Sequence, residues 1–227
     1  MSDLEIEALK LSLQVALAAV GFSLPIAILV AWVLARKTFP GKSFLDGFVH
    51  LPLILPPVVV GYVLLVGLGR NGIVGSFLFD TIGLTFAFTW KGAAVAAAVM
   101  AFPLMVRAIR LSLESVDQGL EQAARTLGAN PLRVFATVTL PLASPGILTG
   151  AILGFARSLG EFGATITFVS NIPGETRTLP IALYTLTQIP GGEAGAFRLV
   201  VISVIVAFAA LLVSEMMARR LKSRLGG

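Results

Sequence analysis

Long apolar runs, separated by short polar segments, cover most of this chain. The runs are uncharged or nearly uncharged and occupy residues 11–35, 48–68, 84–106, 142–172 and 199–217. About 20 apolar residues cross the hydrocarbon core of a bilayer as a helix, so each run suits one span. The apolar residues come in blocks rather than in amphipathic stripes, and a protein core of this size cannot bury them all. The pattern predicts an all-α integral membrane protein with about five transmembrane helices.

The composition supports the same class. Of the 227 residues, 56% are hydrophobic and 13% are charged, whereas soluble domains carry roughly a quarter charged residues. The absence of cysteine excludes disulfides, thiolate catalysis and cysteine metal sites. The formal net charge of +5 invites a nucleic-acid interpretation, but basic residues between spans are the ordinary bias of a membrane protein. We therefore expect contact with membrane lipid and no nucleic-acid partner.

The distribution of lysine and arginine predicts the orientation. With five spans, three of the polar segments share one side of the membrane, and they hold most of the 17 basic residues. Their members are Arg36, Lys37 and Lys42; Arg107, Arg110, Arg125 and Arg133; and Arg219, Arg220, Lys222 and Arg224. The positive-inside rule assigns this side to the cytoplasm. We expect a multi-pass protein of the cytoplasmic (inner) membrane, with its N-terminus outside and its C-terminus in the cytoplasm.

One polar, punctuated segment lies between the third and fourth runs, at residues 117–141. Asp117 is placed to cap a first short helix, and Gly128 is placed to end it, since glycine accepts the left-handed conformation. Asn130, followed by a proline, is typical of the start of a second helix. The segment therefore predicts two short helices that meet at a glycine bend. An ordinary loop whose helices lie on the lipid headgroups is the alternative.

The spacing within this segment resembles the EAA motif of binding-protein-dependent ABC importers. The matching positions are Ala123, Ala124, Gly128, Leu140 and Pro141, with Val138 in place of an isoleucine. Gln122 stands where that family has its glutamate, and Glu121 lies one residue earlier. In the resembled family the segment forms a coupling helix, which docks in a groove on a cytoplasmic ATPase.

The resemblance implies a set of ATPase-docking residues in this chain: Glu121, Gln122, Ala123, Ala124, Gly128 and Leu132. Because Gln122 carries no charge, we expect docking through shape and apolar contact rather than through one charge. That contact is centred on Ala124, Gly128 and Leu132. Exposed apolar groups at Leu132 and Phe135 would also need a partner to cover them.

The resemblance extends over almost the whole chain. Residues 38–42, 50–62, 102–110 and 157–177 are similar to the molybdate permease subunits of ABC importers, which are related to the sulfate and tungstate permeases. It implies one transporter domain over residues 9–219, with a coupling segment at 117–141, in the architecture of type I importer permeases.

The resemblance also implies the partners and the cycle. A homodimer of this subunit would move molybdate by alternating access, with two cytoplasmic ATPase subunits and a periplasmic or extracellular molybdate-binding protein that docks near residues 171–198. This chain would bind no cofactor, because ATP and magnesium belong to the ATPase.

Two places in the spans are candidates for the translocation path. Pro56 and Pro57, with Pro52, interrupt the second run and leave carbonyl groups that must face protein or water; a static kink is the alternative. Arg157 and Glu161 are four residues apart in the fourth run, so they share a helical face and can pair. A charged side chain within a transmembrane run usually faces the protein interior or water, so this pair is a candidate for lining the path. The alternative is a structural ion pair at the outer interface. Glycines beside Glu161 indicate a helix break there.

A glycine stripe in the fourth run predicts close helix packing. Its members recur every four residues, at Gly146, Gly150 and Gly154. Small residues at this spacing let two helices approach closely, and a second copy of the chain is one possible neighbour. Incidental glycine enrichment is the alternative.

Other function classes find little support in the sequence. There is no P-loop, and no nucleophile–base pair or metal-ligand cluster can be assembled, so we expect a non-catalytic subunit and no metal site. A stand-alone secondary anion carrier would predict an inverted repeat or a chain of intramembrane acids, and neither is present. A sulfate or tungstate permease of the same family stays open, because physical reasoning from the residues does not separate these anions.

Overall fold

The computed structural model describes residues 2–225, and every regular element in that range is helical. The prediction of an all-α protein is therefore confirmed. The elements are α1 (Asp3–Arg36), α2 (Lys42–Ile54), α3 (Pro57–Leu68), α4 (Ile73–Ile82), α5 (Trp90–Ser115), α6 (Gln118–Thr126), α7 (Pro131–Val134), the π-helix η1 (Phe135–Thr139), α8 (Leu140–Leu142), α9 (Ser144–Leu159), α10 (Gly163–Val169), α11 (Leu179–Thr187) and α12 (Glu193–Leu225).

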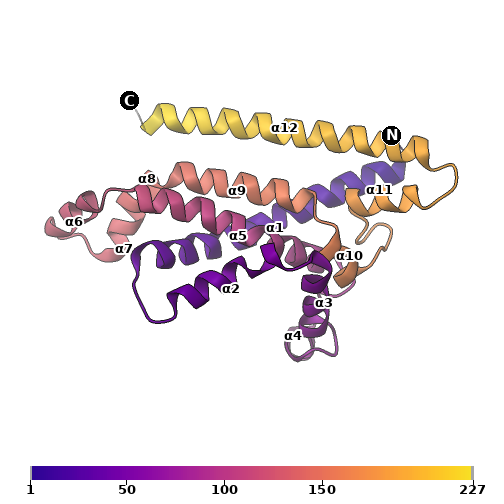
Figure 1. Ribbon diagram of the computed structural model, residues 1–227, viewed down its shortest axis with the longest axis horizontal. Coiled ribbons are helices and arrows are strands. Elements are labelled where there is room, and N and C mark those ends of the chain that lie inside the picture. The colour runs from indigo at the N-terminus through magenta and orange to yellow at the C-terminus, as the bar shows by residue number, and fades with distance from the viewer. Residues whose placement is uncertain (1, 226–227) are drawn as a thin grey trace.

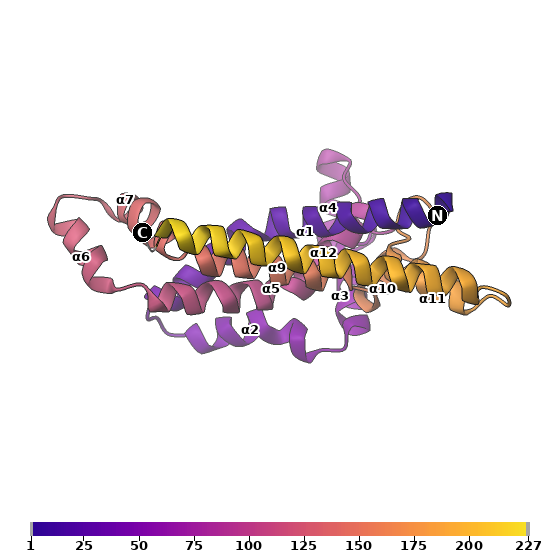
Figure 2. The same ribbon diagram turned by 90° about the horizontal axis from the view of Figure 1, so that it is seen from above.

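The long helices α1, α5 and α9 pack against one another and form an elongated bundle, with α12 along its side (Figure 1). Three helices in the described residues are long and apolar enough to cross a membrane, and the number rises to five if each sharply bent pair is one span. This agrees with about five spans. Helices α6 and α7 project beyond one end of the bundle, and α11 lies at the opposite end (Figure 2).

Helix α5 forms the centre of the bundle. It is rich in alanine, and its buried residues contact α1 on one side and α9 on the other. The predicted glycine stripe of α9 faces it. A Cβ at Gly146 would overlap Ser112, one at Gly150 would lie 3.0 Å from Ile109 Cγ1, and one at Gly154 would lie 2.6 Å from Met105 Sδ. The stripe thus packs against α5 of the same chain, which leaves no room on that face for a second copy.

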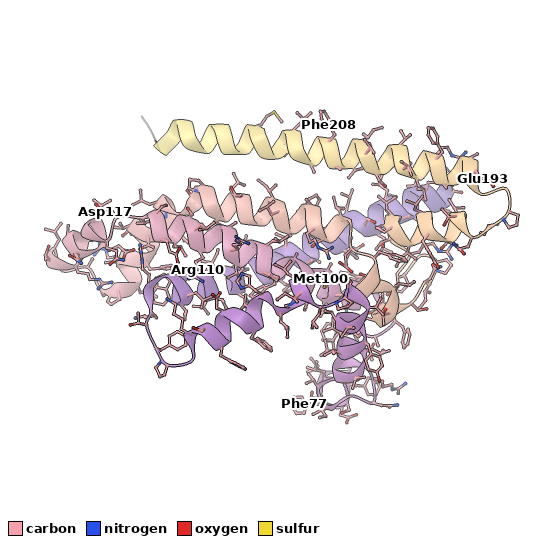
Figure 3. All side chains as sticks on the ribbon, viewed as in Figure 1. Phe77, Met100, Arg110, Asp117, Glu193 and Phe208 are labelled. Atoms are coloured by element: carbon pink, nitrogen blue, oxygen red, sulfur yellow. The ribbon has the colours of Figure 1, made fainter. Side chains whose placement is uncertain are left out.

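The second predicted span is not one continuous helix. Helix α2 runs through Pro52 without a break, and the interruption comes only at Leu55 and Pro56, where α3 turns away by 113°. Proline lacks an N–H and its ring clashes with the preceding turn, so the paired prolines end α2. Helix α3 then leads into α4, and the two form an arm that projects sideways from the bundle, with Phe77 near its tip (Figure 3).

The third predicted span begins later and ends later than expected. Helix α5 starts at Trp90, because the Thr89 hydroxyl accepts a hydrogen bond from the Gly92 amide at 3.3 Å and caps the helix. Phe88, just before the cap, has a positive φ of 62°, which no helix accommodates. The fourth predicted run also divides, because α9 ends at Leu159 and α10 begins at Gly163.

The N-terminal half of α1 is hydrogen-bonded to the segments that follow α10. Arg198 Nε donates to Glu5 Oε1 at 2.8 Å, and the amide of Leu179 donates to Ser12 Oγ at 2.7 Å. Helix α1 therefore connects the two ends of the molecule. The basic side chains of Arg219, Arg220, Lys222 and Arg224, which contributed to the predicted orientation, lie outside the side chains that the structure describes.

Candidate functional site

We define the insert as residues 117–141. Its first leg is α6, and its return leg consists of α7, η1 and the start of α8. The helix caps and the glycine bend form where the sequence predicted them. Asp117 Oδ1 accepts a hydrogen bond from the Gly119 amide at 2.8 Å and caps α6. The chain then turns at Gly128, whose φ is +86°, in the left-handed region that glycine tolerates. Asn130 Oδ1 accepts from the Arg133 amide at 2.8 Å and caps α7. The prediction of two short helices around a glycine bend is confirmed.

The return leg of the insert differs from the simple helix that the sequence predicted. After four residues α7 changes into the π-helix η1, in which the Leu140 amide bonds to the carbonyl of Phe135, five residues back. The reason lies at Pro141, which has no N–H to donate and whose ring clashes with the previous turn of an α-helix. A wider turn relieves this conflict, and such turns occur frequently at functional sites.

The tip of the insert exposes apolar side chains beyond the end of the bundle. Figure 3 shows Asp117 at this end, far from Glu193 at the other. Leu132 is 80% exposed and Leu127 is 88% exposed. Among the other predicted docking residues, Gln122, Ala123 and Gly128 are exposed and Ala124 is half-buried. These residues form one accessible surface around the glycine bend.

Glu121 does not belong to that surface, although we predicted it there. It is the buried residue of α6, and its Oε1 accepts hydrogen bonds from Arg36 Nη2 at 3.0 Å and from Thr139 Oγ1 at 2.8 Å. Its carboxylate therefore faces this chain rather than a partner. Sequence reasoning missed Arg36 and Thr139 as its partners, because no local pattern connects positions so far apart in the chain.

Phe135, which the sequence left without a covering partner, is half-buried against this same chain. Its ring packs edge-on against Trp32, with ring centroids 5.7 Å apart and an interplanar angle of 71°. This is a favourable aromatic geometry. Lys37 Nζ lies 5.3 Å from the centre of the Trp32 ring on α1. The return leg is thus fixed to the last turns of α1, and Leu132 remains the exposed apolar residue of the two.

The second candidate site is the break between α9 and α10, where the predicted pair forms, although Glu161 lies in the break and not on a helical face shared with Arg157. Arg157 Nη1 lies 2.6 Å from Glu161 Oε2, and Glu161 Oε1 accepts the Ala164 amide at 2.8 Å. The Glu161 side chain is 2% exposed and that of Arg157 is 27% exposed. One carboxylate thus neutralises an arginine and also satisfies the open N-terminus of α10.

The structure brings the two predicted path segments together, because α3 packs against α10. A Cβ added to Gly61 would lie 2.5 Å from the carbonyl oxygen of Ala164, and one added to Gly163 would lie 2.8 Å from Pro57 Cβ. The break at Pro56 and Pro57, both exposed, therefore adjoins the break that Glu161 caps. Both are places where the backbone leaves the helical ladder.

No metal site emerges in the part of the chain that the structure describes, where no three histidine, aspartate or glutamate side chains are grouped to hold an ion. The polar chemistry of the described residues consists instead of ion pairs and helix caps. These groups hold and orient segments of the chain.

Comparison with known sequences gives a match over nearly the full length. Residues 8–224 match the family described as "Binding-protein-dependent transport system inner membrane component". The chain is 64% identical over 226 residues to the "Molybdenum transport system permease protein ModB" of Escherichia coli K12, covering 100% of this chain and 99% of that protein. The protein of the same name from Haemophilus influenzae is 59% identical, with 98% and 97% covered. The "Sulfate transport system permease protein CysT" of Salmonella typhimurium is 39% identical over 81% of this chain and 66% of that protein.

Comparison with solved structures gives the same fold. A bacterial ABC transporter involved in the import of the acidic polysaccharide alginate has a chain that superposes with a TM-score of 0.77 at 21% identity, over 97% of this chain and 80% of that one. The MetNI methionine ABC transporter, in an inward-facing conformation, gives a TM-score of 0.75 at 17% identity, with 97% and 99% covered. At these identities the likeness concerns the fold alone.

Proposed function

The chain belongs to the family of binding-protein-dependent transport system inner membrane components, and from this premise we propose that it is the permease subunit of an ATP-driven molybdate importer. The observation that carries the proposal is the 64% identity to a molybdenum transport permease over 100% of the chain. That coverage includes the insert and both helix breaks. The sulfate permease relative is 39% identical, so sulfate is the second candidate anion, with tungstate beside it.

Membership of this family makes the chain a multi-pass inner-membrane component of an importer that works with an ATPase and a binding protein. In our proposal the ATPase carries the ATP and magnesium, and this chain binds neither. Two copies of the chain enclose the path, because one small bundle leaves little room for a channel within itself. An external binding protein delivers the anion at the end where α11 lies.

The exposed tip of the insert is the proposed contact with the ATPase. Leu127, at the end of α6, and Leu132, on α7, are exposed on helices that project beyond the bundle, and an exposed apolar surface of this kind fits an interaction site. Gln122, Ala123 and Gly128 lie on the same surface. Small residues at the bend allow a partner groove to approach closely, which fits docking through shape and apolar contact.

The proposed orientation places the insert in the cytoplasm. Arg36, Arg125 and Arg133 belong to the insert or to the bundle end nearest to it, and basic residues accumulate on the cytoplasmic side. With an odd number of spans the N-terminus then lies outside and the C-terminus inside. The same end of the bundle thus meets the ATPase and the cytoplasm.

Transport then follows an alternating-access cycle. Closure of the ATPase dimer by ATP drives the two inserts together and opens the path outward, and hydrolysis lets it open inward. The permease has two conformations and no chemistry of its own, and each ligand biases the equilibrium by binding one conformation better. Rigid-body movement of packed helices is the ordinary means of such a change.

The paired breaks of α3 and α10 are the proposed lining of the path. Glu161 neutralises Arg157 at 2.6 Å, so an oxyanion that passes meets a guanidinium whose charge is already balanced. A bare arginine would attract the anion strongly and hold it. The pair therefore guides the anion without trapping it, and tight capture is left to the binding protein.

Reconstitution tests the proposal directly. The chain, a molybdate-importer ATPase and a molybdate-binding protein are assembled in liposomes, and uptake of labelled molybdate is followed with ATP inside the vesicles. We expect ATP-dependent uptake that excess unlabelled molybdate abolishes and that sulfate competes for weakly. Uptake that needs no ATPase would favour the lone carrier, and strong competition by sulfate at equal concentration would favour the sulfate permease.

The docking surface is tested by Leu132→Asp and Gly128→Asp. Each puts a charge on the proposed apolar contact, and we expect about tenfold or greater loss of ATPase co-purification, in line with an interface hot spot. The matched control for ATPase co-purification is Ile189→Asp, the same kind of change on a half-exposed residue at the opposite end of the molecule, where the binding protein and not the ATPase is proposed to dock. Full ATPase retention and uptake in Leu132→Asp would remove the insert from the interface.

A further inference from the structure

We propose that Arg36 is a positioning residue that holds the insert at a fixed angle to α1, through Glu121 and Thr139, so that ATPase movement is passed to the bundle. This inference rests on the proposed function, because it concerns how the docked insert transmits force. It assigns to Glu121 a role inside the permease instead of a contact with the ATPase.

The insert needs such a join because it lies outside the bundle (Figure 2). Helix α6 packs on η1 and α7, that is, on the other leg of the same insert. Of its nine residues only Glu121 is buried. An insert attached to the bundle only through its two chain connections would bend when the ATPase moves it. The contacts between the insert and the bundle therefore decide how much of that movement reaches the bundle.

Arg36 gathers three segments at one point. Its Nη2 lies 3.0 Å from Glu121 Oε1 on α6 and 3.1 Å from the carbonyl oxygen of Val116, where α5 ends. Thr139 Oγ1, at the end of the π-helix, donates to the same carboxylate oxygen at 2.8 Å. Both legs of the insert and the end of α5 thus converge on the last residue of α1.

Burial makes this join stiff and specific. The side chains of Arg36 and Glu121 are each 9% exposed, and Thr139 is 2% exposed. Charged hydrogen bonds in a water-poor environment are short and directional, and leaving either charge without its partner is strongly unfavourable. The insert therefore does not swing away from α1 unless both buried charges lose their partners.

A second contact, one turn before Arg36 on α1, also holds the insert against α1. Trp32 packs against Phe135 of η1, with ring centroids 5.7 Å apart. Phe135 begins η1 and packs on α1, whereas Thr139 ends η1 and reaches α1 only through Glu121. Helix α1 packs along α5 and α9. A displacement of its C-terminal end, where Arg36 lies, is therefore passed to the bundle.

The test compares coupling in Arg36→Gln, Glu121→Gln and the double variant. Each is reconstituted with the ATPase and the binding protein, normalised to folded permease, and measured for ATPase retention, ATP hydrolysis and molybdate uptake. We expect ATPase retention to stay within about threefold of the unmodified permease, while uptake per ATP hydrolysed falls by about tenfold, the usual scale of coupling between sites. The double variant should be no worse than either single one, because the two residues act as a unit.

Two further variants keep the test decisive if the glutamine variants fold poorly. Thr139→Val removes one hydrogen bond to the carboxylate, and we expect a smaller loss of coupling in the same direction. Arg110→Gln is the control, since Arg110 pairs with Asp46 and Glu114 on the more exposed surface of α5 and does not touch Glu121. Its uptake per ATP should equal that of the unmodified permease.

The outcomes separate the inference from the proposed function. An unmodified complex that neither retains the ATPase nor transports molybdate would defeat the proposed function itself. With an active complex, normal coupling in Arg36→Gln would overturn the inference. Loss of ATPase retention in Glu121→Gln but not in Arg36→Gln would also overturn it, and would return Glu121 to the docking surface.

Discussion

Glu121 and Glu161 are both buried and both bind an arginine, yet the two regions are built differently. Glu161 pairs with Arg157 one helical turn earlier, and its other oxygen caps the next helix. Glu121 pairs with Arg36, 85 residues earlier in the chain, and also receives Thr139. The first pair stabilises a break within one segment, whereas the second joins an external lever to the bundle. A buried charge with a distant partner thus marks a join between separate parts of the fold.

The two arginines also differ in their access to the surroundings. The Arg36 side chain is 9% exposed and that of Arg157 is 27% exposed. An arginine that loses its partner in a closed site stays uncompensated, whereas a more accessible one can turn toward water or another polar group. The comparison therefore predicts a ranking of stability losses.

The largest loss is expected for Glu121→Leu. It leaves the Arg36 guanidinium buried without its carboxylate, which costs about 3–5 kcal/mol of unfolding free energy. Denaturant unfolding of the purified permease in detergent measures the change. The control is the double variant Arg36→Met with Glu121→Leu, which removes both charges and should recover most of the loss. A double variant less stable than the single one would contradict this account.

A smaller loss is expected for Glu161→Leu, about 2–3 kcal/mol, because the cap of α10 is lost while Arg157 keeps some access to polar surroundings. The same unfolding measurement applies. Glu161→Gln keeps an acceptor for the Ala164 amide and should lose only about half as much. If Glu161→Leu equals or exceeds Glu121→Leu, accessibility does not govern the difference between the two pairs.

Thr139→Val should cost about 1.5 kcal/mol, the value of one hydrogen bond to a charged group. The side chains have nearly the same shape, so packing is retained. The matched control is Thr137→Val, two residues earlier on the same π-helix, whose exposed hydroxyl bonds only to the carbonyl of Arg133. Equal losses in the two variants, measured by thermal shift, would show that Thr139 gains nothing from Glu121.

The smallest effect is expected for Arg110→Gln. Its partners Asp46 and Glu114 have side chains that are 38% and 42% exposed, and accessible ion pairs contribute about 0–1 kcal/mol. Added salt should reduce even this difference, because screening weakens accessible pairs first. A loss as large as that of Glu121→Leu would mean that burial does not separate structural pairs from weak ones.

Features that depend on near neighbours in the chain could be predicted from the sequence. The caps at Asp117 and Asn130 and the left-handed turn at Gly128 follow from local hydrogen bonding and backbone sterics, and the structure contains all three. The pair of Arg157 and Glu161 was predicted from their four-residue separation, and it forms even though α9 ends at Leu159 and Glu161 lies in the break. The docking set stays a prediction, except that Glu121 is buried, because a position beside a motif says nothing about which way a side chain points.

Features that depend on the path of the backbone could not be predicted in this way. The prolines indicated a break in the second run, but not that α3 leaves at 113° or that its start meets α10. Proline removes a hydrogen bond and so allows a bend, while the packing of the neighbouring helices sets its direction. The π-helix before Pro141 could not be predicted either, since several backbone conformations relieve the clash between the proline ring and the preceding turn.

The sequence by itself determined that this is a helical membrane protein, that a capped, glycine-bent insert separates its third and fourth runs, and that it resembles importer permeases. Those properties rest on hydrophobic length, local capping and motif spacing, which neighbouring residues contain. Only the tertiary structure decided that the glycine stripe faces α5, that the two breaks adjoin, and that Arg36 binds Glu121. Such contacts depend on how helices cross, and burial turns them from weak surface attractions into strong, specific joins.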